Sequence, residues 1–180
     1  MYQRVAEIVE ALKAGRADFT ITNATPARAQ DVDFTPPLVA LELGYLALPG
    51  SPVVDIAAVD RPGMRIGVSQ GSSSQAALTR EFKQAQVVPV PSLNAAGELL
   101  QQRRLDAFAT NKAIVFELAD TLPGARVLPG RWGLERLAIA VPKGRDSAAP
   151  YLKTFAEEVR ATGRVQQAAD GAGLRGAATN

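Results

Sequence analysis

Two sets of residues have the types and positions needed to bind a small anion. Arg28 ends the turn Thr25-Pro26-Ala27-Arg28, and its guanidinium is a planar fork that matches both oxygens of a carboxylate. Ser72 and Ser73 lie between an expected strand and an expected helix, where backbone N–H groups and hydroxyls favour an anion. Each set also has a simpler interpretation, an exposed turn arginine and serines that only cap the helix. The residues by themselves leave both interpretations open.

A second pattern is a similarity between two segments 88 positions apart, in which the same residue types recur as Asp18, Thr22 and Asn23, then as Asp106, Thr110 and Asn111. Both segments are expected to run as helix, tight connection, strand and Thr-Asn. Chance similarity of two ordinary units is one explanation. The other is two similar α/β lobes, each with a Thr-Asn pair at the carboxyl end of a strand, where open α/β sheets bind ligands. Lys112 follows the second pair, as a contact for an acidic group of the ligand or as a solvated helix-end lysine.

The composition excludes several classes of chemistry. The 180 residues include no Cys and no His, which excludes disulfides, thiolate or imidazole metal sites and Ser-His-Asp triads. The formal net charge is +2 without a basic run, so nucleic acid is not an expected partner. No apolar stretch reaches the roughly 18 residues of a membrane span, and the first residues do not form a signal peptide. We expect neither a metal nor a cofactor.

Expected helices and strands alternate along most of the chain. Helices are expected at 5–14, 74–82, 93–100, 111–118, 148–162 and 165–172, with Ser92 and Ser147 as caps of two of them. Strands are expected at 18–22, 32–34, 41–48, 65–69, 87–90, 105–109, 126–128 and 137–141. This alternation predicts an α/β protein with a largely parallel sheet.

Several short motifs occur in an order that resembles one protein family. Residues 12–18, 25–28 and 32–37 match the patterns L-x-x-G-x-x-D, T-x-x-R and V-x-F-[ST]-x-P. Residues 67–74, 105–111 and 138–144 look like a strand with a Gly-Ser turn, a second-lobe strand and a returning crossover. In this order and spacing, the motifs resemble those of the bacterial extracellular solute-binding proteins of family 3, the amino-acid-type periplasmic binding proteins of ABC transporters. The resemblance covers nearly the whole chain.

The resemblance implies a type II periplasmic-binding-protein-like fold, with two α/β lobes joined by two crossover segments. Lobe I is expected at residues 1–43 plus 143–180, lobe II at 50–137, and the crossovers near 44–49 and 138–142. Family members normally begin with a strand, a helix and a strand before the equivalent of Tyr2, so lobe I is expected to be incomplete. Such a lobe has an open sheet edge, through which we expect copies of the chain to associate as a homo-oligomer.

The resemblance also assigns ligand-binding roles. It implies that Arg28 and Ser73 bind one ligand carboxylate from opposite lobes, and that Asn23 presents a small polar side chain to the ligand. Most amino-acid binders carry Asp at the position of Asn111, where it meets the ligand ammonium. Because Asn is neutral, an ammonium here needs another anion, and Glu135 is either that anion or an ordinary surface acid. A carboxylate with a neutral or weakly polar remainder is at least as consistent with this site.

By this resemblance, the chain is expected to be a periplasmic receptor and not an enzyme. It would bind a small carboxylate-bearing solute, an amino acid or related organic acid, in the cleft between the lobes. It would then deliver the solute to the membrane subunits of an ABC importer. Two alternatives remain: the ligand-sensing module of a membrane receptor, and a dehydratase-like enzyme on the same scaffold.

Overall fold

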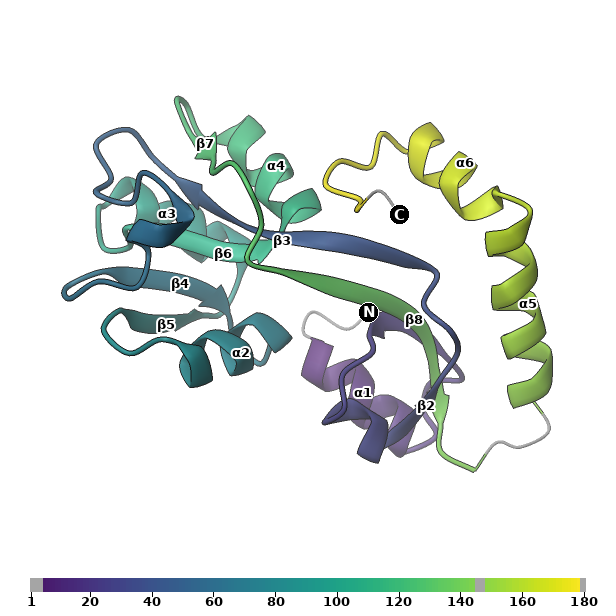
Figure 1. The fold of residues 1–180 in the computed structure, drawn as a ribbon. Coiled ribbons are helices and arrows are strands. Elements are labelled where there is room, and N and C mark those ends of the chain that lie inside the picture. Colours follow the sequence, from purple (N-terminus) through teal and green to yellow (C-terminus); the bar gives the residue numbers. More distant parts are fainter. Residues whose placement is uncertain (1–4, 145–147, 179–180) are drawn as a thin grey trace. The chain divides into compact units, whose positions relative to one another are not determined.

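The chain folds into two compact units. The computed structural model describes residues 5–144 and 148–178. Unit 1 spans residues 1–41 and 135–180, and unit 2 spans residues 42–134. Two strands, β3 (Val39–Ala47) and β8 (Gly133–Pro142), continue from one unit into the other (Figure 1). No helix in the described part of the chain is long and apolar enough to cross a membrane.

Unit 2 is built on three parallel strands with an antiparallel neighbour. Strand β4 pairs in parallel with both β5 and β6, while β3 runs antiparallel to β6 and to the short β7. The strands are β4 (Arg65–Ser69), β5 (Gln86–Val90), β6 (Ala107–Asn111) and β7 (Arg126–Val127). The helices are the 3-10 helix η2 (Ile56–Ala58), α2 (Ser73–Glu81), α3 (Leu93–Gln101) and α4 (Lys112–Thr121).

Apolar side chains cover both faces of the unit 2 sheet. Tyr45 belongs to one buried cluster, with Val68 and Leu78, whereas the adjacent Leu46 belongs to another, with Phe108. Neighbouring residues of a strand point to opposite faces, so the two clusters lie on the two sides of the sheet. A sheet buried on both faces needs nearly continuous apolar strands, which explains why these segments show little alternation.

Unit 1 is organised around β8. Ala140 pairs with Thr20 of β1 and with Phe34 of β2, so β8 lies between these two strands, and both run antiparallel to it. The strands are β1 (Thr20–Asn23) and β2 (Val32–Phe34). The helices are α1 (Val5–Lys13), the 3-10 helix η1 (Arg28–Gln30), α5 (Ala149–Ala161) and α6 (Arg164–Gly171). Val9 and Leu12 of α1 pack on Val32 and Ala140.

The mixed α/β class is confirmed, but the largely parallel sheet is a wrong prediction. Within the described residues, the parallel ladders are those of β4 with β5 and β6, and the pairings of β1, β2 and β7 are antiparallel. The reason is that β3 and β8 carry the chain back through the sheet against the direction of their neighbours, which an alternating order of elements does not reveal. Of the two expected caps, Ser92 accepts a hydrogen bond from the Ala95 N–H, and Ser147 lies outside the described residues.

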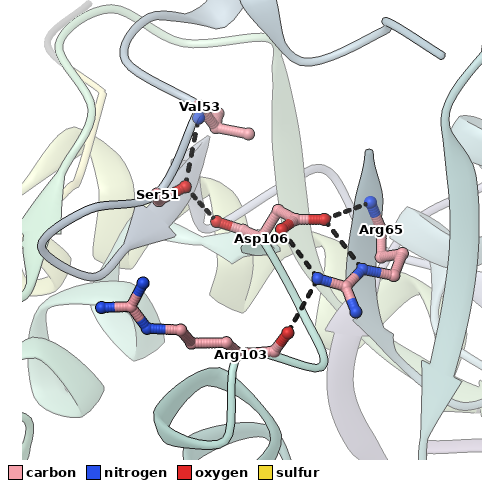
Figure 2. A network of polar contacts seen from close by, with 5 residues as sticks. All are labelled: Ser51, Val53, Arg65, Arg103 and Asp106. Carbon is pink, nitrogen blue, oxygen red and sulfur yellow. Dashed lines mark hydrogen bonds and ion pairs between the residues drawn. The ribbon is translucent and has the colours of Figure 1, made fainter. Parts of the chain in front are cut away.

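A polar network holds together the amino ends of β4 and β6 (Figure 2). The Arg65 backbone N–H and Nε donate to Asp106 Oδ2 at 2.8 and 3.0 Å, and its Nη2 donates to Oδ1 at 2.9 Å. The same Nη2 donates to the Arg103 carbonyl, and the Ser51 hydroxyl donates to the Asp106 carbonyl. Burial alone would raise the pKa of Asp106, but the hydrogen bonds and charge of Arg65 outweigh it and lower that pKa. Asp106 is therefore an ionised structural anchor.

We expect Asp106→Asn to lower the free energy of unfolding by about 1–3 kcal/mol, because it leaves half-buried donors of Arg65 without a charged acceptor. Urea denaturation of the variant and wild type measures this difference. Glu117→Gln, at an exposed acid of α4 in the same unit, is the control and should change little.

The same pair of proteins tests the charge of Asp106. Its pKa is lower in the folded chain than in the unfolded chain, so its stabilisation is complete above the unfolded value and is lost as the pH falls through the folded value. The difference in the free energy of unfolding between wild type and Asp106→Asn should therefore become smaller below about pH 4. If this difference stays constant down to acid pH, Asp106 does not stabilise the fold as an ionised carboxylate.

Candidate functional site

Arg28 is half-buried in unit 1 and is held by the end of β1. Its Nη1 donates to Thr22 Oγ1 at 3.0 Å and to the Asn23 carbonyl at 3.1 Å. Its backbone N–H donates to Thr25 Oγ1, which closes the turn before η1. None of the described residues accepts a hydrogen bond from Nε or Nη2 of this guanidinium. One nitrogen thus fixes the side chain, and the other two donor groups remain available for a bidentate contact with a carboxylate.

The charge of Arg28 is only partly compensated. Burial lowers the pKa of Arg28, and the nearby carboxylate of Glu135 on β8 opposes this shift. Guanidinium groups nevertheless stay protonated in proteins, so the site keeps a positive charge. In unit 1, the charge of Glu135 therefore acts on Arg28. The expected contact of Glu135 with a ligand ammonium stays a prediction.

Asn23 ends β1 and links it to β8. Its side chain is 8% exposed, and its Oδ1 accepts a hydrogen bond from the Arg136 N–H at 3.0 Å. Its main-chain carbonyl accepts the bond from Arg28 described above. Asn23 therefore positions Arg28 through the backbone and fixes the strand register. Its direct contact with a ligand remains a prediction.

The two serines lie at the start of α2 in unit 2. Ser72 is the N-cap, and its Oγ accepts a hydrogen bond from the Gln75 N–H at 3.1 Å. Gln75 reaches back, and its Oε1 accepts a hydrogen bond from the Gly71 N–H at 2.7 Å. This reciprocal arrangement is similar to a capping box, except that the second donor is the N–H of the residue before the N-cap. Ser73 is the half-buried first residue of the helix. Capping by Ser72 is thus established, and the anion-binding role of both serines stays a prediction.

Asn111 has the same kind of role at the end of β6. It is the N-cap of α4, and its Oδ1 accepts a hydrogen bond from the Ile114 N–H at 3.1 Å. The preceding Thr110 is buried, as Thr22 is at the end of β1. Both Thr-Asn pairs thus end a strand with a buried threonine, although Asn23 bridges strands whereas Asn111 starts a helix.

Lys112 forms an ion pair that the sequence analysis missed. Its Nζ lies 2.6 Å from Glu42 Oε2, and Arg131 Nη1 lies 3.3 Å from Glu42 Oε1. Only 13% of the Lys112 side chain is exposed, so its interpretation as a solvated lysine is wrong. A Cβ on Gly44 would lie 2.8 Å from Lys112 Cγ, so this glycine gives the lysine room to cross β3. The signal was Glu42, a single acid within an otherwise apolar strand.

No metal centre is evident in the described part of the chain, since residues 5–144 and 148–178 contain no group of three or more potential acidic ligands. The polar side chains described above therefore offer two kinds of donor: the guanidinium of Arg28 in unit 1, and the starts of α2 and α4 in unit 2. All of them favour an anion.

The chain belongs to the bacterial extracellular solute-binding proteins, family 3, whose family model matches residues 1–171. The type II periplasmic-binding-protein-like fold expected from the motifs is thereby confirmed. No match is found among curated protein sequences.

Solved structures show the same fold at low sequence identity. The solute receptor for L-cysteine of Neisseria gonorrhoeae has a TM-score of 0.80 and 24% identity, and the match covers 92% of this chain and 68% of that chain. The Salmonella typhimurium periplasmic binding protein with high arginine specificity has a TM-score of 0.82 and 21% identity, and the match covers 95% of this chain and 79% of that chain. A third structure is a substrate-binding protein of an amino acid ABC transporter from Streptococcus pneumoniae, bound to L-arginine. It has a TM-score of 0.78 and 12% identity, and the match covers 89% of this chain and 70% of that chain.

We expect Asn111→Ala to lower the free energy of unfolding by about 1 kcal/mol, because it removes the acceptor for the Ile114 N–H. Asn111→Asp keeps an acceptor at the same place and should be nearly neutral in stability. Urea denaturation of the two variants gives the comparison. Equal destabilisation by Ala and Asp would show that the cap is not what Asn111 contributes.

Proposed function

We propose that this chain binds a small carboxylate-bearing solute, an amino acid or a related organic acid, and delivers it to the membrane subunits of an ABC importer in the periplasm. The observation that carries the proposal is the state of Arg28. It is half-buried and held through Nη1, and no described residue accepts a hydrogen bond from Nε or Nη2. Family membership supports a receptor role, and a relative of the same fold is a substrate-binding protein of an amino acid ABC transporter.

The physical argument rests on how a carboxylate leaves water. An anion taken from solvent needs charge compensation and hydrogen bonds to both oxygens. The free edge of the Arg28 guanidinium offers both in a fixed orientation. The start of α2 offers backbone N–H groups and the hydroxyls of Ser72 and Ser73. We propose that each unit supplies donors to the same carboxylate, so that the ligand favours the conformation in which both sets bind it.

The remainder of the ligand is proposed to be neutral or weakly polar. Asn111 carries no charge, and its Oδ1 already accepts a bond from the Ile114 N–H. The positive charge of Lys112 is already paired with Glu42, so it is a poor partner for a second acidic group of the ligand. The charge of Glu135 already acts on Arg28, so this acid is a poor partner for a ligand ammonium. These contacts favour a carboxylic acid without a tightly held ammonium.

Binding without turnover is the proposed outcome. Acid–base catalysis needs a group that exchanges protons near neutral pH and lies within reach of the substrate. The chain contains no His, and the polar residue at the end of β6 is an amide and not an acid.

We expect a thermal-shift screen of amino acids and small carboxylic acids to find a stabilising ligand, because a ligand at 100 times its Kd stabilises the folded state by about 2.7 kcal/mol. Arg28→Gln should weaken the binding free energy of that ligand by roughly 2–5 kcal/mol, because it removes one partner of the ion pair. Isothermal titration measures this change. Arg16→Gln removes an exposed arginine of the same unit and serves as the control. If a ligand is found and Arg28→Gln binds it as tightly as wild type does, the proposed site is wrong.

A second substitution tests the ligand class. We expect Asn111→Asp to shift the preference from carboxylic acids without an ammonium towards α-amino acids, because it adds an anion at the end of β6. The comparison uses matched pairs such as a 2-hydroxy acid and the corresponding 2-amino acid, by isothermal titration. An unchanged ratio of the two affinities would indicate that residue 111 does not face the ligand.

A further inference from the structure

Unit 1 contains a pocket of about 240 Å³ that the carboxylate site does not use. It lies between the segment 37–40, which leads into β3, and the turn that joins α5 to α6. Gly163, Val165 and Ala169 form part of the helical wall. Its volume is below the roughly 300–1,000 Å³ of sites for drug-sized ligands, so it suits a small ion or molecule.

Two arginines line this pocket and give it its charge. Arg136 comes from β8, and Arg160 comes from the last turn of α5. Neither guanidinium makes a hydrogen bond or an ion pair with a described residue. The residues that line the pocket include no Asp and no Glu. Both arginines are exposed, and together they give the pocket lining a positive charge with no acid to offset it.

The start of α6 adds positive potential at the same place. Its N-cap is Gly163, with φ +72°, so no side chain caps the first turn, and this turn contains no acidic residue. Gly163 and Val165 both line the pocket. The partial positive charge of the helix start therefore reinforces the two arginines.

The pocket is separate from the site of Arg28. Glu135, whose charge acts on Arg28, directly precedes Arg136 on β8. Consecutive side chains of a strand point to opposite faces, so Arg136 projects away from the face that carries Glu135. A ligand of this pocket thus need not compete with a ligand of Arg28.

We propose that this pocket binds a small oxyanion with two negative charges, held by Arg136 and Arg160, with inorganic phosphate as the probe. The oxygens of such an anion can accept charged hydrogen bonds from both guanidinium groups. It would touch β3 and β8 together, the two strands that continue into unit 2. A bound inorganic anion would therefore contact both strands that continue from one unit into the other.

Isothermal titration with inorganic phosphate at constant ionic strength tests the proposal. Wild type should bind one phosphate saturably, and Arg136→Gln or Arg160→Gln should each weaken the binding by about tenfold or more. Arg164→Gln is the matched control, because it removes the same charge from the first residue of α6 without changing the lining. It should change the affinity much less than either pocket variant.

The outcomes separate this pocket from the carboxylate site. Equal weakening by all three variants would show non-specific attraction and overturn the proposal, as would the absence of saturation at tens of millimolar phosphate. Weakening by Arg28→Gln alone would place phosphate at the first site and overturn the pocket, while leaving the proposed receptor function intact. In wild type, phosphate should also slow phenylglyoxal modification of Arg136 and Arg160, read by peptide mass spectrometry, and this needs no variant to fold.

Discussion

The polar contacts of unit 1 depend on one half-buried cation, the guanidinium of Arg28. A guanidinium in that position must find acceptors or destabilise the fold. Arg28 finds them in Thr22 Oγ1 and the Asn23 carbonyl, which are presented together only because β1 ends at this point. β1 keeps that position because Asn23 pairs with Leu137 of β8 and its side chain accepts a hydrogen bond from the Arg136 N–H. The strand pairing of unit 1 therefore sets the orientation of the Arg28 guanidinium.

In unit 2, neutral side chains satisfy the polar groups at two helix starts. Ser72 and Asn111 follow buried strands, and each uses a side-chain oxygen to accept a helix N–H. Capping uses these oxygens as acceptors, whereas a hydroxyl proton or a side-chain amide is still a donor by nature. The polar strand ends are therefore richer in donors than in acceptors. This imbalance is a property of helix starts in general.

The sequence predicted the order of the elements and most of their bounds, since apolar periodicity, Gly and Pro positions and the Ser92 cap are local signals. It did not predict strand direction, because β3 and β8 pair over long sequence separations that leave no local pattern. It singled out Arg28 through a motif, but not Thr22 as the acceptor of Nη1. It missed the Lys112–Glu42 pair, because the two residues lie 70 positions apart. Long-range partners decide whether a charge is solvated or used.

Residues 135 and 136 show how closely function depends on register. Glu135 acts on Arg28, and Arg136 lines the pocket beside α5 and α6, although the two are neighbours on one strand. A shift of β8 by one residue would exchange the faces of both side chains and place an arginine beside Arg28. The like charges would then oppose each other where a carboxylate now balances a guanidinium. The hydrogen bond from the Arg136 N–H to Asn23 Oδ1 favours the observed register, so one buried amide helps to keep Glu135 and Arg136 on their present faces of the sheet.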